Sequence, residues 1–371
     1  MNREVSLYLD ICRFSAAFLV FISHVAVRQI SGESRLWIIG DFGEDAVAIF
    51  FVLSGFVIGY VTESRETDVK TYAVSRLARL YSVALPALAL TFLLDAAGAA
   101  LRPDIYSTAY FSYGSDHLPW RFMAGLLFVN ELWNSHTVMG SNGPYWSLGF
   151  EAWYYIAFGV AVFAPARWRV PACVLVLAIA GPKIAALFPL WLMGLGLFHI
   201  MKRRPLPPVL GWSAFVGGLA AFLAVHYFAR DYRGHMFGPF NLAPAQAAST
   251  FYFMTLGLLF AVHLAGFRAV SSAFAPFLNR HAARIRYIAG ATFSLYLFHM
   301  PIIMLTVAIS PWPVGSWALL LMALTIPVAA AFALSLVTER KKDPWRGLFE
   351  RALGGANAWR KLPPVPHGAT R

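Results

Sequence analysis

Charged residues are scarce in this chain of 371 residues: Asp, Glu, Lys and Arg make up 13% of it, against roughly 25% in soluble domains. Hydrophobic residues reach 59% and aromatic residues 16%. A water-soluble fold could not bury so much apolar side chain, and the same composition excludes intrinsic disorder. The apolar runs are about 20 residues long and continuous, which argues against a β-barrel. The expected fold class is an all-α, polytopic transmembrane helix bundle.

Cysteine is almost absent. Cys12 and Cys173 both fall in apolar runs, so neither a disulfide framework nor a metal-ligand cluster is expected. Acidic residues are also few, and the net charge is +12. In a membrane protein the position of basic residues sets orientation, so this charge predicts no nucleic-acid partner. Asp10 and Arg13 interrupt the first apolar run, which therefore does not resemble a cleavable signal peptide and is expected to stay in the mature protein.

Ten apolar segments are long enough, or nearly so, to cross a bilayer. The fifth and sixth contain Gly181, Pro182, Lys183 and Pro189, and could form two tilted spans or a broken pair. The predicted segments are Val5–Val27, Asp45–Val61, Tyr81–Ala100, Tyr145–Ala164, Pro171–Ala185, Leu187–Ile200, Leu210–Ala229, Thr250–Phe267, Tyr287–Ile309 and Gly315–Thr338.

The loop charges support an even number of spans. If both termini are cytoplasmic, most of the 30 Lys and Arg residues lie on the cytoplasmic side. We therefore predict a transmembrane domain over residues 1–339 and a basic cytoplasmic tail over 340–371 that holds a short amphipathic segment.

The longest outer loop, Leu101–Pro144, contains the apolar stretch Phe122–Trp133. This stretch is too short to span, so we interpret it as an interfacial or re-entrant piece packed on the bundle.

The first span carries three ionisable residues, which are costly in a membrane and therefore suggest function. Arg13 and His24 are eleven residues apart, so both point to about the same side of a helix, with His24 ~16 Å nearer the outer surface. Asp10 lies one turn below Arg13 and can pair with it. Simple neutralisation of Arg13 by Asp10 is the alternative to a polar path through the bundle.

The second span begins at its outer end with Glu44 and Asp45, level with His24. Either carboxylate could orient a neutral imidazole, or both could simply cap the helix. Gly55 and Gly59 follow in mid-span, and their spacing predicts close helix packing.

Further along the chain, Arg76 and Arg79 share one face of a basic cytoplasmic stretch. They fit either ordinary positive-inside charge or a phosphate clamp for a nucleotide-like donor. Glu151, in the fourth span, must be hydrogen-bonded or protonated. His299, in the ninth span, could serve catalysis or structure, and Glu339 ends the last span.

Taken in order, these residues resemble the acyltransferase-3 family of integral-membrane O-acyltransferases. The resemblance extends from about Val5 to Glu339. It rests on Arg13 with His24, FFVLSGF at Phe50–Phe56, the paired arginines Arg76 and Arg79, WSLGFE at Trp146–Glu151, SLYLFHMPI at Ser294–Ile302, and Glu339.

The resemblance implies ten transmembrane helices in a bacterial inner membrane, acyl-coenzyme A (usually acetyl-coenzyme A) as a cytosolic co-substrate, and no permanently bound cofactor. The acceptor is a hydroxyl of a surface or exported glycan or glycolipid. Arg13 and His24 carry over as the essential pair, Arg76 and Arg79 as donor contacts, and Glu151 and Glu339 as functionally important. Where many members have an acidic residue before the SGF block, this chain has Ala48.

Physical reasoning agrees with this expectation, because cytosolic arginines can hold the phosphates of coenzyme A while His24 serves as general base for the acceptor hydroxyl. A mechanism through a covalent acyl-enzyme is the alternative. The rival function is a transporter or flippase of a glycan or small metabolite, which predicts internal repeats that the sequence does not show. A sensory or scaffolding role leaves the Arg13–His24 arrangement unexplained. Acyl donor, glycan acceptor and membrane lipids are the expected partners, and the oligomeric state stays open.

Overall fold

The computed structural model describes residues 2–32, 36–106, 116–203, 206–234, 236 and 243–354. Over this part of the chain the ordered elements are helices, and β-type pairing is limited to one isolated bridge between Met139 and Asn142. The predicted all-α helix bundle is therefore confirmed. The predicted tail reaches beyond the described residues, which end at 354.

Each of the ten predicted segments overlaps a helix. These helices are α1 (Arg3–Val25), α4 (Gly43–Arg65), α5 (Val69–Leu101), α8 (Trp146–Phe163), α9 (Ala166–Ala180), α10 (Pro182–Met201), α11 (Pro208–Phe228), α12 (Pro244–Ala289), α13 (Thr292–Ile309) and α14 (Trp317–Ser335). Shorter elements connect or follow them: α2 (Arg28–Ser31), α3 (Trp37–Gly40), α6 (Pro103–Tyr106), α7 (Leu118–Leu126), η2 (Gly143–Tyr145), η3 (Arg230–Tyr232) and α15 (Asp343–Ala352).

Eight helices in the described ranges are long and apolar enough to cross a membrane: α1, α4, α5, α10, α11, α12, α13 and α14. The fourth and fifth predicted spans correspond to α8 and α9, of 18 and 15 residues. The number of ten spans and the cytoplasmic position of both termini stay predictions.

Several predicted boundaries differ from those of the helices, and α5, for example, begins at Val69 rather than Tyr81. The break between the fifth and sixth segments lies at Gly181, not after Ala185, because Gly181 has φ +93° and a Cβ there would lie 2.5 Å from Cα of Trp133. The eighth segment does not end at Phe267: α12 is a single helix of 46 residues, or roughly 69 Å. Its extension carries basic residues well past a bilayer core of about 30 Å. The next helix accordingly starts at Thr292 rather than Tyr287.

Local capping explains where several helices begin. The Asn2 side chain accepts from the backbone N–H of Val5 at 3.0 Å, and the Asp68 side chain accepts from those of Lys70 and Thr71. Ser316 caps α14 in the same way. Each cap satisfies N–H groups that the first helical turn leaves without a partner.

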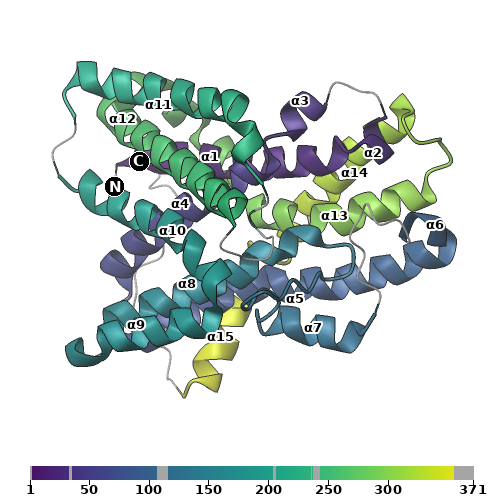
Figure 1. Cartoon of the computed structure of the whole chain (residues 1–371), viewed down its shortest axis with the longest axis horizontal. Helices are drawn as coiled ribbons and strands as arrows, with labels where there is room; N and C mark the ends of the chain where they lie inside the picture. The colour runs from purple at the N-terminus through teal and green to yellow at the C-terminus, as the bar shows by residue number, and fades with distance from the viewer. Residues whose placement is uncertain are drawn as a thin grey trace.

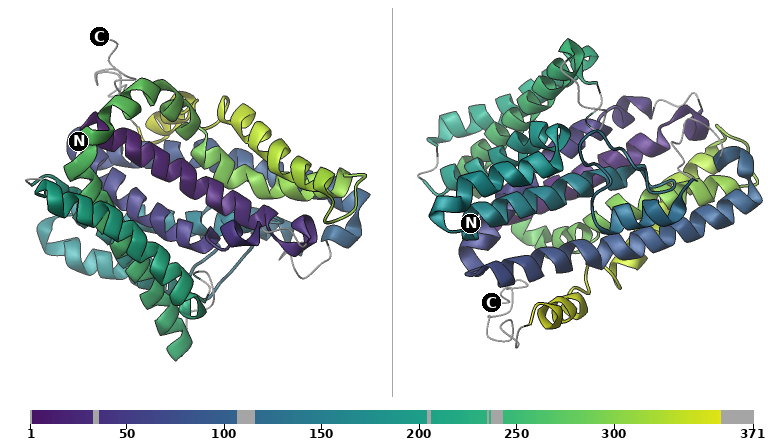
Figure 2. Two further views of the ribbon diagram at one scale, coloured as in Figure 1. Left: turned by 90° about the horizontal axis from the view of Figure 1, so that it is seen from above. Right: turned by 60° about the horizontal axis from the view of Figure 1, so that its bottom comes forward.

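Helix α1 lies inside the bundle, against α4, α12 and α13 (Figure 1). The pair α11 and α12 forms one flank, and α5 with α7 forms the opposite flank (Figures 1 and 2). Helix α15 lies beside the bundle against α5, where Phe349 contacts Tyr81. The central position of α1 brings its ionisable residues into the interior.

Helices α4 and α10 approach so closely that glycine is needed on both sides. A Cβ on Gly55 would lie 1.9 Å from the carbonyl oxygen of Trp191, and a Cβ on Gly194 would lie 1.8 Å from that of Val52. The close packing predicted for Gly55 is confirmed. The contact also places the Trp191 indole N–H 3.3 Å from the Ser54 hydroxyl, which belongs to the site described below.

Gly55→Ala should therefore force α4 and α10 apart. We expect a loss of stability of about 1–3 kcal/mol or more, measured as a lower unfolding temperature of the detergent-solubilised protein. Gly196→Ala, on the facing helix α10, is the matched control, because nothing lies within 4 Å of a Cβ at Gly196. Equal unfolding temperatures for the two variants would contradict the close contact.

Candidate active site

Two cavities lie one after the other along α1. The first, which we call the histidine pocket, has a volume of about 340 Å³, within the size range of small-ligand sites, roughly 300–1,000 Å³. It is lined by acidic, basic and aromatic side chains from five parts of the chain. They include Ser23, His24, Asp41, Glu44, His136, Ser141, Trp146, Arg233 and Tyr296.

The second cavity, which we call the arginine pocket, is smaller, at about 80 Å³. Two guanidinium groups and two carboxylates line it together with aromatic and hydroxyl side chains. The lining includes Arg13, Ser54, Arg79, Ser147, Glu151, Tyr155, Phe293, Tyr296 and Glu339.

Tyr296 and Val47 line both cavities and so lie between them. The Tyr296 hydroxyl is held 2.7 Å from that of Ser147 and donates to the carbonyl oxygen of Pro144 at 3.2 Å. His24 opens on one cavity and Arg13 on the other, as expected for two residues on one face of α1 at different depths. In place of one continuous polar path, the structure has two cavities, and the Tyr296 side chain lines both of them.

The His24 imidazole is held in one tautomer. Its Nδ1–H donates to the backbone oxygen of Val20 at 2.8 Å, and Nε2 of His299 lies 3.2 Å from the same nitrogen. His299 in turn donates from Nδ1 to the backbone oxygen of Leu295 at 2.8 Å, so its Nε2 can only accept when the ring is neutral. Neutral His24 therefore carries its proton on Nδ1 and a lone pair on Nε2, as a general base requires.

Asp45, one of the two carboxylates expected to orient His24, contacts other side chains instead. The Asp45 carboxylate lies 2.5 Å from Nδ1 of His226 and accepts from the Tyr252 hydroxyl at 3.2 Å. Glu44 accepts from the backbone N–H of Met236 and lines the histidine pocket with His24. The orienting contacts of His24 come instead from its own helix and from His299.

Arg13 and Asp10 form the predicted pair at 3.9 Å, with both side chains about one quarter exposed. At this distance the contact is a loose ion pair, so Asp10 does not hold the guanidinium tightly. The Arg13 side chain is therefore available to the arginine pocket that it lines.

Glu151 is half-buried and has the hydrogen-bond partners expected from its position in a membrane span. Its carboxylate accepts from the Ser54 hydroxyl at 3.0 Å and from the Tyr155 hydroxyl one turn further along α8. Ser54 is itself contacted by the Trp191 indole. The close packing of α4 on α10 thus fixes the position of Glu151.

The structure separates the two paired arginines. Arg79 lines the arginine pocket with its guanidinium 5.9 Å from the Phe293 ring centre. Arg76 is buried, forms an ion pair with buried Glu66, and lies against the rings of Tyr72 and Tyr155. Although they share a helix face, only Arg79 is among the residues that line the cavity.

Glu339 binds the start of α13. Its carboxylate accepts from the backbone N–H groups of Phe293 and Ser294, both at 3.0 Å, where the positive end of the helix dipole favours an anion. Beyond the last span, Lys342 has its pKa lowered to about 8, first by burial and then by the nearby positive charge of Arg79. A third basic side chain thus lies close to the arginine pocket.

Sequence reasoning missed Ser54, Tyr155 and Tyr296 as site residues. Ser54 was visible as a polar residue in mid-span, and Tyr155 stands one turn after Glu151, but neither position shows by itself which helix it faces. Among the described residues, no group of three or more His, Cys, Asp or Glu side chains converges to hold a metal ion.

A helical bundle with a histidine in one chamber and two half-buried arginines in the next is an arrangement that a membrane-embedded group-transfer enzyme could use. Comparison with known families agrees: the acyltransferase-domain family of type 3 matches residues 6–336. The chain therefore belongs to the acyltransferase-3 family. This membership favours an enzyme over the transporter that the composition also allowed.

Three characterised relatives are similar over part of their length. The acyltransferase MdmB of Streptomyces mycarofaciens is 30% identical over 156 residues, 39% of this chain and 36% of the relative. The exopolysaccharide production protein ExoZ of Rhizobium meliloti is 29% identical over 153 residues, 38% and 43% respectively. An O-acetyl transferase of Shigella phage Sf6 is 31% identical over 160 residues, 41% and 45%. The matches span less than half of these relatives, and no solved structure matches the chain.

Proposed function

We propose that this protein transfers an acyl group, acetyl by the family's usual preference, from cytosolic acyl-coenzyme A to a hydroxyl of an envelope glycan. The observation that carries the proposal is the succession of the two pockets along α1. The arginine pocket suits a polyanionic donor, and the histidine pocket suits a polyhydroxylated acceptor. The name of ExoZ supports a polysaccharide acceptor, and the name of the phage O-acetyl transferase supports transfer of an acetyl group to oxygen.

On the donor side, Arg79 and Arg13 line a cavity near the predicted cytoplasmic end of the bundle. Guanidinium groups bind phosphate through two parallel N–H donors, and Lys342 adds a further charge nearby. The narrow volume suits an extended pantetheine arm better than a bulky group. The thioester would then approach Tyr296, at the boundary with the second chamber.

On the acceptor side, the histidine pocket combines carboxylates, imidazoles and an indole. Asp41 and Glu44 can accept hydrogen bonds from sugar hydroxyls, and Trp146 can pack against the apolar face of a ring. Arg233 pairs with Asp41 at 2.5 Å and keeps that carboxylate in place. His24 then lies where a hydroxyl of the acceptor would be activated.

The reaction balances without an added reagent. Nε2 of His24 takes the proton of the acceptor hydroxyl while the oxygen attacks the thioester carbonyl. The C–S bond then breaks, an O-acyl ester forms, and His24 returns its proton to the coenzyme A thiolate. His299 accepts the Nδ1–H of His24 throughout and holds the ring in the tautomer that this cycle requires.

The direct test is a purified preparation in lipid nanodiscs, given labelled acetyl-coenzyme A and envelope glycan of the host that has been freed of esters by alkali. We expect label in alkali-labile esters on the glycan. Mass spectrometry of glycan from cells with and without the protein should show the same acyl mass difference. Absence of both signals would contradict the proposal.

His24→Ala should abolish transfer while the protein still folds. A general base contributes about 10²–10⁴-fold to rate, so kcat in the nanodisc assay should fall by that factor. His199→Ala is the matched control, because His199 is exposed at the end of α10. A well-folded His24→Ala variant with near-normal kcat would refute the assignment of the base.

Arg79→Ala should weaken donor binding, whereas Arg76→Ala should mainly lower stability. Loss of Arg79 removes a phosphate contact and should raise the KM for acetyl-coenzyme A by roughly 10- to 100-fold. Loss of Arg76 leaves Glu66 buried without its partner and should lower stability by about 3–5 kcal/mol, with a smaller effect on KM. A stable Arg76→Ala variant with a raised donor KM would instead make Arg76 a donor contact.

Donor affinity should weaken at alkaline pH. Because the pKa of Lys342 is lowered to about 8, its positive charge is present at pH 7 and lost by pH 9. The KM for acetyl-coenzyme A should therefore rise by roughly two- to fivefold across this range. Lys342→Arg should abolish the rise and keep the low KM, whereas the control Lys341→Met, at an exposed neighbour, should keep the wild-type profile. An unchanged profile in Lys342→Arg would show that another group titrates.

A further inference from the structure

The predicted outer loop carries a histidine–carboxylate pair that opens on the histidine pocket. His136 lines this cavity with its side chain 31% exposed, and its Nδ1 lies 2.9 Å from Oε1 of Glu131. Glu131 is fully buried. Because a carboxylate accepts, Nδ1 of His136 donates, and the bond fixes the plane of the imidazole at the wall of the pocket.

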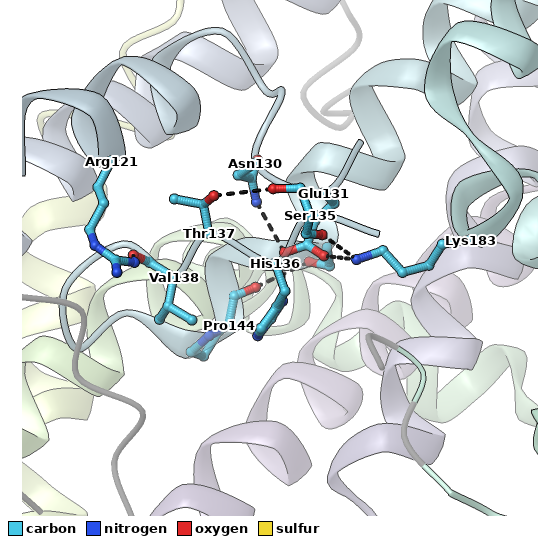
Figure 3. Close-up of polar contacts among 10 residues, drawn as sticks. Arg121, Asn130, Glu131, Ser135, His136, Thr137, Val138, Pro144 and Lys183 are labelled. Atoms are coloured by element: carbon cyan, nitrogen blue, oxygen red, sulfur yellow. Dashed lines mark hydrogen bonds and ion pairs between the residues drawn. The ribbon is translucent and has the colours of Figure 1, made fainter. Parts of the chain in front are cut away.

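The negative charge of Glu131 is balanced by a group other than His136. Its other oxygen, Oε2, lies 2.5 Å from Nζ of buried Lys183, which also donates to the backbone oxygen of Ser135 at 2.6 Å (Figure 3). Lys183 stands in the first turn of α10, where the helix dipole disfavours a cation, so the ion pair offsets that cost. Since the charge of Glu131 is already balanced, its contact with His136 serves to orient the imidazole.

The loop around His136 is anchored on both sides. Thr137 donates through its backbone N–H to the backbone oxygen of Asn130 at 2.9 Å, and Arg121 donates to the backbone oxygen of Val138 at 2.8 Å (Figure 3). Ser141 donates to Asp95 on α5 through both its backbone N–H and its hydroxyl. Asn142 donates to the backbone oxygen of Leu297 on α13. His136 is thus held on a rigid segment, as binding residues require.

We propose that His136, oriented by Glu131 and Lys183, is an acceptor-binding residue that hydrogen-bonds a second hydroxyl of the sugar ring whose first hydroxyl meets His24. This inference rests on the proposed function. The two imidazoles belong to one cavity but come from α1 and from the outer loop. Two fixed imidazoles select an acceptor with at least two hydroxyl groups on one ring, and they disfavour a simple alcohol.

The test uses the nanodisc assay with labelled acetyl-coenzyme A and alkali-deacylated envelope glycan of the host as the acceptor probe. His136→Ala should raise the KM for this glycan by roughly three- to tenfold, the effect of one lost hydrogen bond. The KM for acetyl-coenzyme A should stay as in the wild type. His136→Gln, which keeps a hydrogen-bonding group, should recover most of the loss.

Two further variants separate binding from loop structure. Glu131→Leu combined with Lys183→Met leaves no buried charge unpaired but removes the acceptor that orients His136. It should raise the glycan KM as His136→Ala does. His117→Asn, at an exposed position of the same loop with φ +49°, is the control and should leave both KM values unchanged.

The outcomes distinguish this inference from the proposed function. If the wild type transfers no label to the glycan, the proposed function fails and the acceptor role of His136 fails with it. If the wild type transfers label but His136→Ala has an unchanged glycan KM, only the role of His136 is refuted. A parallel rise in both KM values would likewise refute it, because it would show a structural effect on the whole bundle.

Discussion

An ionisable side chain inside an apolar helix bundle must be paired or must face a polar cavity, and the interior of this protein is built around that requirement. Glu151 is satisfied by Ser54 and Tyr155, and Glu339 by the first N–H groups of α13. The two histidines that meet near the C-terminal end of α1 contact each other and backbone oxygens of their own helices. Because these contacts come from four different helices, the polar groups that serve the site also determine how the helices pack.

Helix α1 acts as the common wall of both chambers. It places Arg13 in one and His24 in the other, and the rise of an α-helix sets their separation at ~16 Å. The interhelical contact that allows only glycine at Gly55 and Gly194 brings α4 and α10 close enough for the Trp191 indole to reach Ser54. The packing of α4 on α10 therefore determines the geometry of the arginine pocket. A change in either would alter the other.

The two chambers fit the proposed reaction, in which donor and acceptor reach the protein from opposite sides of a membrane. Basic groups collect near the end of the bundle that the charge pattern predicts to be cytoplasmic, while carboxylates and an indole surround His24. Tyr296 belongs to both walls, and its hydroxyl is tied to Ser147 and to the chain at Pro144. An acyl group would cross at this residue, with neither large substrate passing through the membrane.

Hydrophobic runs and helical periodicity were enough to predict the all-α bundle, all ten helices and the shared face of Arg13 and His24, because these depend on neighbours within one helix. The break at Gly181 and the length of α12 escaped prediction, since a contact with Trp133 and a basic extension past the apolar run decided them. Arg76 and Arg79 look equivalent in sequence, yet Glu66 binds one and leaves the other at the cavity. In the same way His299 rather than Asp45 orients His24. Which polar group meets which across helices was decided only by tertiary packing, because partners far apart in the sequence leave no periodic signal.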